Sequence, residues 1–267
     1  MKSEHIKNEI RGPFDIIGDI HGCYEETIEL LGKLGYLIKK MRNEDLNFGI
    51  EVSHPENRQV IFVGDLVNKG PNSVAVLKLA MSMINSGIAW CVKGNHEVKL
   101  HRLIKGKGVE RKPSLKETTE QLNNERSLFI LQLDGFIDSL PSHYVFDNGQ
   151  LAIAHAGIKE HMLGDTSKEV RRFCIYGQSK DKLDQSDIPE KYDWASEYKG
   201  KAKVVYGHTP VAQTDWVNNT INIDTGCVYG GHLTALRYPE NELVSVKAKE
   251  IYSKPAKIFK KSKKNAE

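Results

Sequence analysis

The sequence predicts an α/β protein built on a sheet of parallel strands with helices on its faces. Three short apolar runs alternate with helical patterns within the first hundred residues, and this order favours parallel pairing through helical crossovers. After residue 142 the pattern changes to a succession of short strands. This second feature predicts another sheet packed on the first.

The first half of the chain supplies the parallel strands and their crossover helices. Residues 1–12 resemble a polar lead-in, and residues 36–52 a small hairpin. Ile28, Leu31 and Leu34 recur at helical spacing before Gly35, which indicates a helix over 24–34. A second amphipathic helix is expected from Ser73 to residue 86. The apolar runs expected to form buried strands are 14–18, 60–63 and 88–92.

The second half begins with helices and ends with strands. Residues 98–104 and most of 115–139 are expected to be helical, with a glycine- and charge-rich loop at 105–112 between them. A polar, irregular segment covers 164–201 and contains one short helix near 168–175. The expected strands are 143–146, 151–154, 203–206, 220–223, 233–238 and 243–246.

Composition describes an ordinary globular chain. It has 267 residues, 39% hydrophobic and 27% charged, and a formal net charge of +3, which by itself does not indicate nucleic-acid binding. No apolar run reaches membrane-spanning length and no signal peptide begins the sequence. The four cysteines are scattered without a Cys-x-x-Cys pair, which argues for reduced thiols in the cytoplasm and against structural zinc. We expect one domain over 1–250 and a basic, disordered tail over 251–267.

Polar side chains stand where the apolar runs end. Asp19 and His21 follow the first run, and on an extended segment residues i and i+2 point the same way, toward one metal ion. Carboxylates, imidazoles and an amide oxygen suit a divalent ion such as Mn, Fe, Zn or Ni. The set exceeds what one ion needs, so it predicts two ions that generate a hydroxide for attack on a phosphate ester. The residues are Asp19, His21, Asp65, Asn95, His96, His155, His208 and Asp224.

These residues belong to ordered motifs: GDIHG at 18–22, GDLVNKGP at 64–71, GNHE at 94–97, HAG at 155–157 and GHTP at 207–210. In this order the motifs resemble the calcineurin-like binuclear metallophosphoesterases, in the phosphoprotein-phosphatase-like branch. The stretches 204–210, 222–231 and 233–239 are similar to bacterial diadenosine-tetraphosphate hydrolases and to the phosphatase module of bacterial polynucleotide kinase-phosphatase. The resemblance runs from about residue 14 to 246.

The resemblance implies two mixed sheets packed face to face, with flanking helices, and two divalent ions. Manganese is the expected metal, with Fe, Zn, Ni or Co as alternatives. His96 would protonate the leaving oxygen, Asp224 would support the site from its edge, and Asn95 would also contact substrate. The implied ligands are Asp19 and His21 for the first ion, Asp65 as the bridge, and Asn95, His155 and His208 for the second.

The chain departs from the family where Asn68 and Lys69 replace the usual Asp and Arg. The usual Asp orients the catalytic His, and Asn68 can do so only without a charge. The usual Arg holds phosphate with a bidentate fork, which Lys69 lacks. We therefore expect Asn68 to act with His96, Lys69 to bind substrate, and the enzyme to be active but slower.

Several substrates remain open. The late motifs favour nucleotide substrates, such as diadenosine tetraphosphate or nucleic-acid phosphate ends. A serine/threonine protein phosphatase is an alternative. A third possibility is a module that keeps its metals, has little turnover and binds RNA through the lysine-rich tail.

Overall fold

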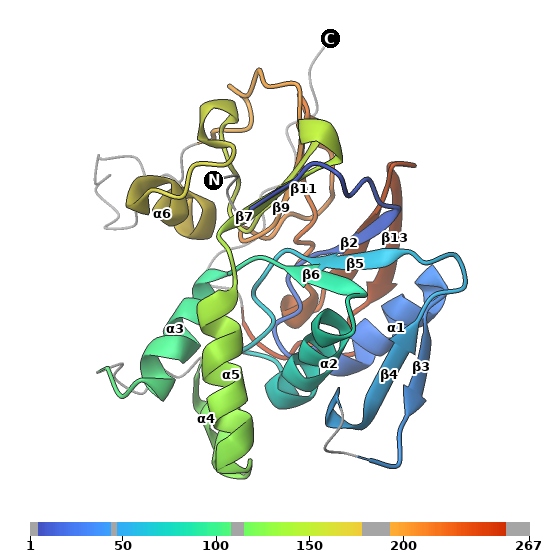
Figure 1. Cartoon of the computed structure of the whole chain (residues 1–267), viewed down its shortest axis with the longest axis vertical. Coiled ribbons are helices and arrows are strands. Elements are labelled where there is room, and N and C mark those ends of the chain that lie inside the picture. The colour runs from blue at the N-terminus through green and yellow to red at the C-terminus, as the bar shows by residue number, and fades with distance from the viewer. Residues whose placement is uncertain (1–4, 44–46, 108–114, 178–192, 255–267) are drawn as a thin grey trace.

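The computed structural model describes residues 5–43, 47–107, 115–177 and 193–254. Its strands form two large sheets and one small hairpin, and the strands of the two large sheets lie one above the other in Figure 1. The predicted basic tail from residue 255 onward lies outside the described residues.

The first sheet has the strand order β13-β12-β2-β5-β6. Its strands β2, β5 and β6 are parallel, as the alternation of strands and helices predicts. The last two strands, β12 and β13, return to this sheet and pair antiparallel, so the expectation that all late strands build a second sheet is wrong for these two. The bounds are β2 Phe14–Ile17, β5 Gln59–Phe62, β6 Ala89–Cys91, β12 His232–Tyr238 and β13 Glu242–Lys247.

The second sheet has the order β1-β7-β8-β9-β11-β10. Strands β8, β9 and β11 run parallel, β7 pairs antiparallel with β8, β10 pairs antiparallel with β11, and β1 pairs parallel with β7. The two-residue strands β1 and β10 fall in segments that the sequence analysis leaves without structure. The bounds are β1 Ile6–Lys7, β7 His143–Phe146, β8 Leu151–Ala154, β9 Lys203–Tyr206, β10 Trp216–Val217 and β11 Thr220–Asn222.

The two sheets share an apolar core. Phe14, Ile16 and Ile61 of the first sheet are fully buried against Phe146 and Ile153 of the second. Because side chains alternate along a strand, the neighbouring residues of the first sheet point to its other face. This arrangement confirms the expected pair of mixed sheets packed face to face.

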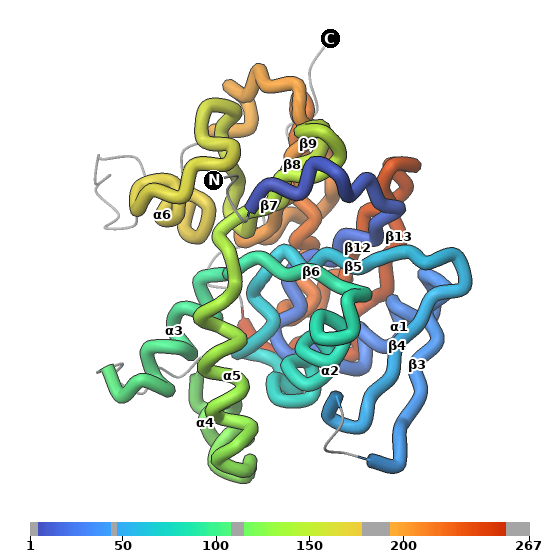
Figure 2. The backbone as a smooth tube through the Cα atoms, viewed as in Figure 1, coloured from blue at the N-terminus to red at the C-terminus, as the bar shows by residue number. Residues whose placement is uncertain are grey.

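Helices cover the outer faces of both sheets (Figures 1 and 2). Those between residues 24 and 139 lie on the first sheet, and α6 lies on the second with Trp194 and Tyr198. The hairpin of β3 and β4 lies beside α1 and α2. The bounds are α1 Tyr24–Leu34, β3 Leu37–Lys40, β4 Ile50–Ser53, α2 Ser73–Asn85, α3 Asn95–Ile104, α4 Lys116–Asn123, α5 Ser127–Ser139 and α6 Lys168–Tyr176; short 3-10 turns occupy Asn47–Gly49, Asp147–Gly149, Glu160–Met162 and Cys227–Tyr229.

Helix α3 begins at Asn95, three residues before the start that its apolar pattern predicts. The earlier start puts Asn95 and His96 in the first turn of a helix, where their backbone is fixed. The four cysteines are buried and free. Among the described residues, none of the helices has the length and apolar character that crossing a membrane requires.

Candidate metal centre

The polar residues that the sequence singles out gather where strands of both sheets end. Asp19 and His21 follow β2, Asp65 follows β5, and Asn95 and His96 open α3 after β6. From the second sheet, His155 follows β8, His208 follows β9 and Asp224 follows β11. Parallel strands bring their carboxyl ends to one edge, and there these groups meet.

The loops that carry these groups are tight turns. His21 has φ 48°, Asp65 φ 52° and His208 φ 72°, a left-handed backbone that is uncommon for non-glycine residues and that Asp and His adopt more readily than most. The backbone N–H of His21 donates to the carbonyl of Asp65 at 2.8 Å, which ties the first two turns together. The expected extended geometry of Asp19 and His21 is therefore wrong, and the turn itself brings their side chains together.

Asp65 lies between two groups of donor atoms. The first group comes from Asp19 and His21, and the second from Asn95, His155 and His208. Its Oδ2 is 3.5 Å from His21 Nε2, and that nitrogen is 4.0 Å from Asp19 Oδ2. Its Oδ1 is 3.4 Å from His155 Nε2, on the side of Asn95 and His208. One carboxylate thus contacts both groups with different oxygens, which is the arrangement that a carboxylate bridging two ions requires.

The rings of His21 and His155 direct the lone pair of Nε2 toward the candidate metal centre. Nδ1 of His21 donates to the carbonyl of Val67 at 3.0 Å, and Nδ1 of His155 donates to that of Val63 at 3.1 Å. Each ring therefore presents an unprotonated Nε2 to the centre. Burial, followed by the charge of Lys69, lowers the pKa of His21 to about 3, so the ring is neutral at physiological pH and able to bind a metal ion.

The second group brings three potential metal-binding atoms close together in this orientation. Asn95 Oδ1 lies 3.0 Å from His155 Nε2 and 3.1 Å from His208 Nδ1, and those two nitrogens are 3.0 Å apart. All three can act as acceptors. A hydrogen-bonded alternative rotates the Asn95 amide so that its NH₂ points to the histidines. With the oxygen inward, the donor set suits a divalent ion, so the residues present fit the predicted metal.

The carboxylates of the site repel each other. Burial raises the pKa of Asp19 well above its ordinary value, and the charges of Asp224 and Asp65 raise it further. Asp224 is itself buried, and its Oδ1 accepts from the N–H of Gly226. A divalent cation stabilises such crowded carboxylates in their charged form.

Glu97 holds the turn that carries Asp65. Its fully buried carboxylate accepts from the N–H groups of Asp65 and Leu66 at 2.8 Å and of Gly94 at 2.9 Å. Burial, with the charge of Asp65, raises the pKa of Glu97 to about 7. The motif alone does not indicate whether Glu97 supports the site or only places a negative charge at the start of the helix. These hydrogen bonds indicate that Glu97 positions the turn that carries Asp65.

Two glycines are required by close approach to the ligands. A Cβ on Gly207 would lie 2.0 Å from Asp19 Oδ1, and one on Gly94 would lie 2.3 Å from Asp65 Oδ1. Any side chain at either position would displace a predicted metal-binding carboxylate.

His96 lies beside the first group. Its backbone N–H donates to Asp65 Oδ1 at 2.9 Å, and its ring packs edge-on against His21. Asn68 Nδ2 is 3.1 Å from His96 Nδ1, so the predicted Asn68–His96 pair is in contact. The donor atoms of His21, Asp65 and His96 lie within 4.8 Å of one another, so the geometry also accommodates His96 as a ligand.

Lys69 reaches into the centre. Its Nζ lies 2.9 Å from His21 Nε2 and 5.1 Å from the centroid of the Tyr229 ring. The ammonium group thus stands where a metal ion would contact His21. Binding of an ion there would require Lys69 to leave this contact, and the side chain would then be available to a phosphate group.

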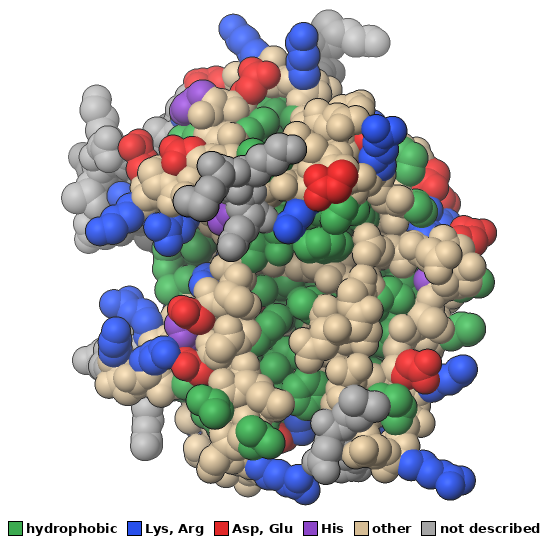
Figure 3. Space-filling model, in the orientation of Figure 1, with side chains coloured by type: hydrophobic (Ala, Val, Ile, Leu, Met, Phe, Trp, Pro, Cys, Tyr) green, Lys and Arg blue, Asp and Glu red, His purple; other side chains and the backbone are tan. Residues whose placement is uncertain are grey.

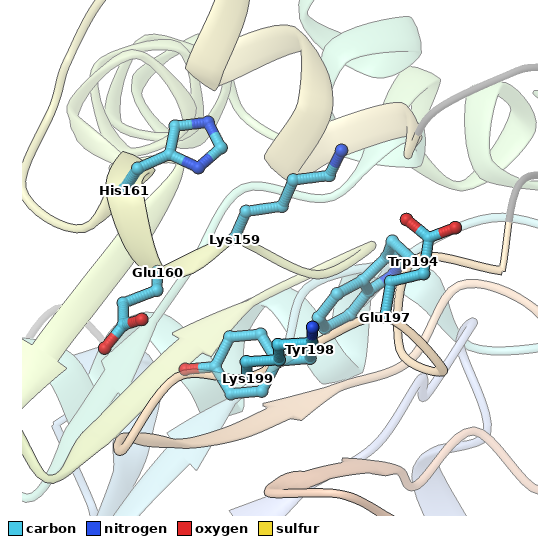
Figure 4. Close-up of a pocket in the computed structure, with 7 residues that line it drawn as sticks. All are labelled: Lys159, Glu160, His161, Trp194, Glu197, Tyr198 and Lys199. Carbon is cyan, nitrogen blue, oxygen red and sulfur yellow. The ribbon is translucent and has the colours of Figure 1, made fainter.

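A small pocket lies outside the candidate metal centre (Figure 4). It has a volume of about 160 Å³, and its lining includes Trp194 and Tyr198. Trp194 fills the space that a side chain on Gly157 would occupy, which places the pocket behind the HAG motif. None of the predicted ligands lines it.

Comparison with known proteins decides the family. The model of the calcineurin-like phosphoesterase family matches residues 12–244. This chain belongs to that family. Its members use a binuclear divalent metal centre, and the chain is accordingly a hydrolase of phosphate esters or anhydrides.

Relatives of this phosphoesterase include bis(5'-nucleosyl)-tetraphosphatases PrpE [asymmetrical]. The protein from Halalkalibacterium halodurans is 41% identical over 241 residues, covering 89% of this chain and 94% of the relative. That from Bacillus subtilis is 41% identical over 237 residues, covering 87% and 93%. A solved structure described as a candidate diadenosine tetraphosphatase has 25% identity and a TM-score of 0.63, covering 93% of this chain and 99% of its own.

Lys99 is a site residue that the sequence analysis missed. Its Nζ lies 3.2 Å from His96 Nε2. The available signal was its spacing, because residues i and i+3 share one face of a helix. The sequence analysis predicted that this helix begins at residue 98, so it did not place His96 and Lys99 on the same helix.

Proposed function

We propose that this phosphoesterase hydrolyses bis(5'-nucleosyl) tetraphosphates such as diadenosine tetraphosphate, and that it cleaves them asymmetrically. The observation that carries the proposal is Asp65 between two groups of metal-binding atoms. Close relatives over nearly the whole chain bear the name of this activity, which supports the choice of substrate. Manganese is the metal we propose, since the carboxylate and amide oxygens of the donor set suit it; the imidazoles also suit Fe, Zn or Ni.

In this mechanism Asp19 and His21 would hold one ion, Asn95, His155 and His208 would hold the other, and Asp65 would contribute to both. When bound, such ions would supply an activated water molecule and positive charge for the phosphate oxygens. Glu97 fixes the Asp65 turn, and Asp224 supports Asp19 from the edge. His96 gives a proton to the leaving oxygen while Asn68 orients its ring, and Lys69 binds a phosphate oxygen.

A panel of substrates and metals tests the proposal. The full chain, freed of metal and reloaded with Mn, Zn, Ni or Mg, is assayed on diadenosine tetraphosphate, a 5'-phosphorylated oligonucleotide, a phosphoserine peptide and p-nitrophenyl phosphate. We expect the highest kcat/KM with Mn and diadenosine tetraphosphate, giving ATP and AMP in equal amounts. Release of two ADP molecules, or a preference for the peptide, would contradict the proposal.

His96→Ala tests the role of the histidine beside the first group. If His96 is a proton donor, the variant keeps two Mn per chain by elemental analysis. Loss of proton transfer is then expected to slow phenyl phosphate by about 10²- to 10³-fold, and p-nitrophenyl phosphate much less, because the better leaving group needs less protonation. Loss of an ion would instead assign His96 as a ligand.

Asn68→Asp with Lys69→Arg restores the family's usual pair. A carboxylate stabilises the imidazolium of His96, and a guanidinium binds phosphate with two parallel hydrogen bonds. We expect kcat on p-nitrophenyl phosphate to rise roughly 3- to 10-fold, measured under saturating Mn. A decrease would mean that these side chains do not act on His96 and phosphate as assigned.

Two other functions are less well supported. The yeast serine/threonine phosphatase similar to human PP5 has a TM-score of 0.58 with 14% identity, which shows a shared fold alone. Binding of RNA through the basic tail stays a prediction, since residues 255–267 lie outside the described part. The division into a domain over 1–250 and a tail is likewise a proposal; Tyr252, just beyond residue 250, donates to Glu26 Oε1.

A further inference from the structure

One face of helix α3 continues from the metal centre as a line of cationic side chains. Lys99 lies one turn after His96, and Arg102 lies three residues further on. Lys99 Nζ is 3.2 Å from His96 Nε2 and 2.9 Å from the outer atom of the Asn95 amide. The ammonium group therefore adjoins both a predicted metal ligand and the predicted proton donor.

The orientation of the Asn95 amide decides which of its two polar atoms faces Lys99. When Oδ1 points to a metal ion, the NH₂ of Asn95 faces Lys99. In the tautomer in which Asn68 Nδ2 donates to His96 Nδ1, the proton of a neutral His96 is on Nε2, which faces Lys99. Lys99 Nζ then lies 2.9 Å from the NH₂ of Asn95 and 3.2 Å from the N–H of His96, so three N–H-bearing groups lie close together. An anionic oxygen placed among them would accept hydrogen bonds from all three. The Asn95 amide would then bind a metal ion through its oxygen and donate to the anion through its nitrogen.

Helix α6 faces this surface from the second sheet. Burial raises the pKa of Tyr176, and the charges of Arg102 and Asp65 act on it in opposite directions, so its hydroxyl lies within electrostatic range of both. Lys93 lies just before the GNHE turn, and burial lowers its pKa. The charge of Arg171 also lowers the pKa of Lys93, so Arg171 lies within electrostatic range of it. Lys and Arg side chains gather along the edge formed by α3 and α6 (Figure 3). An extended polyanion could lie along this edge.

We propose that Lys99 binds the phosphate that follows the scissile bond, with Arg102 binding the next, so that α3 selects substrates with a chain of phosphates. This inference rests on the proposed hydrolysis of nucleotide polyphosphates. In that reaction a water oxygen bonds to the attacked phosphorus, the bridging P–O bond breaks, and the departing phosphate keeps the electron pair. Lys99 neutralises the charge that develops there. A monoester such as p-nitrophenyl phosphate has no second phosphate and cannot use this contact.

Lys99→Gln tests the inference, with Lys33→Gln on α1 as the matched control, since Lys33 is half exposed and pairs with Glu29. A hydrogen bond from a charged group predicts that Lys99→Gln lowers kcat/KM on diadenosine tetraphosphate by about 10- to 100-fold. On p-nitrophenyl phosphate we expect less than about a threefold fall, because the contact is absent there. Lys33→Gln should leave both unchanged, and Lys99→Arg should recover most of the lost activity.

Metal content and melting temperature are measured on every variant. Two Mn per chain and an unchanged melting temperature in Lys99→Gln would support a role in substrate binding. Equal losses on both substrates, or no loss on either, would overturn the inference while leaving the proposed function intact. If the unmodified enzyme cleaves p-nitrophenyl phosphate but not diadenosine tetraphosphate, the proposed function itself fails, and the inference with it.

Discussion

Asp65→Asn is expected to reduce kcat/KM on diadenosine tetraphosphate by about 10³- to 10⁵-fold, which corresponds to about 4–7 kcal/mol of transition-state stabilisation. An amide has one oxygen and no charge, so it cannot join the His21 side of the centre to the His155 side as both carboxylate oxygens do. Elemental analysis after gel filtration should find fewer than two Mn per chain.

The fold should survive this substitution. Position 65 has a left-handed backbone with φ 52°, which Asn adopts more readily than most residues. Asp134→Asn on α5 is the matched control, because Asp134 pairs with His101 and Lys105 away from the centre. The control should change kcat/KM less than about twofold, as expected for a surface pair. An Asp65→Asn enzyme that keeps two ions and a tenth of its activity would contradict the bridging role.

The sequence predicted that the candidate site residues lie close together, and the structure brings them together, while their roles stay predictions. Each motif ends an apolar run, and parallel strands necessarily gather those ends at one edge. Asp19, Asp65 and His208 lie far apart along the chain, yet their positions relative to the strands already predicted their proximity. The same logic predicted the three parallel strands of the first sheet.

The sequence was less informative where contacts alone decide the outcome. Strands β12 and β13 follow the strands of the second sheet along the chain, so nothing local indicated that β12 pairs with β2 and that β13 extends the first sheet. Glu97 and Lys99 are charged residues at the start of a helix, which most often indicates exposure. Only the tertiary structure shows that Glu97 binds the Asp65 turn and that Lys99 adjoins His96.

A second large effect is expected at the opposite end of the strands from the metal centre. Asp15 lies within the apolar strand β2 and is fully buried, and Arg58, just before β5, is 2% exposed. Arg58 Nε donates to both oxygens of Asp15, at 3.1 and 3.0 Å, and one of its NH₂ groups donates to the carbonyl of Phe14. Tyr36 adds its hydroxyl to the same carboxylate at 2.9 Å.

Arg58→Met should lower the free energy of unfolding by about 3–5 kcal/mol, because it leaves the carboxylate of Asp15 buried without its main cation. The melting temperature should fall by roughly 6–20 °C, measured by calorimetry. Lys33→Met removes an exposed pair with Glu29 and should cost less than about 0.5 kcal/mol. The activity of folded Arg58→Met enzyme should be nearly unchanged, since Arg58 precedes β5 and Asp65 follows it.

The double variant Asp15→Asn with Arg58→Met tests whether the destabilisation comes from the uncompensated charge of Asp15 or from the other hydrogen bonds that Arg58 loses. Asn at position 15 keeps an acceptor for the Tyr36 hydroxyl but carries no charge, so the loss of Arg58 is less costly in its presence. We expect the double variant to be more stable than the sum of the two single effects predicts, by about 1–2 kcal/mol. Strict additivity would mean that the charge of Asp15 is not what Arg58 compensates, and that the destabilisation comes instead from the bonds of Arg58 to the backbone and to Glu240.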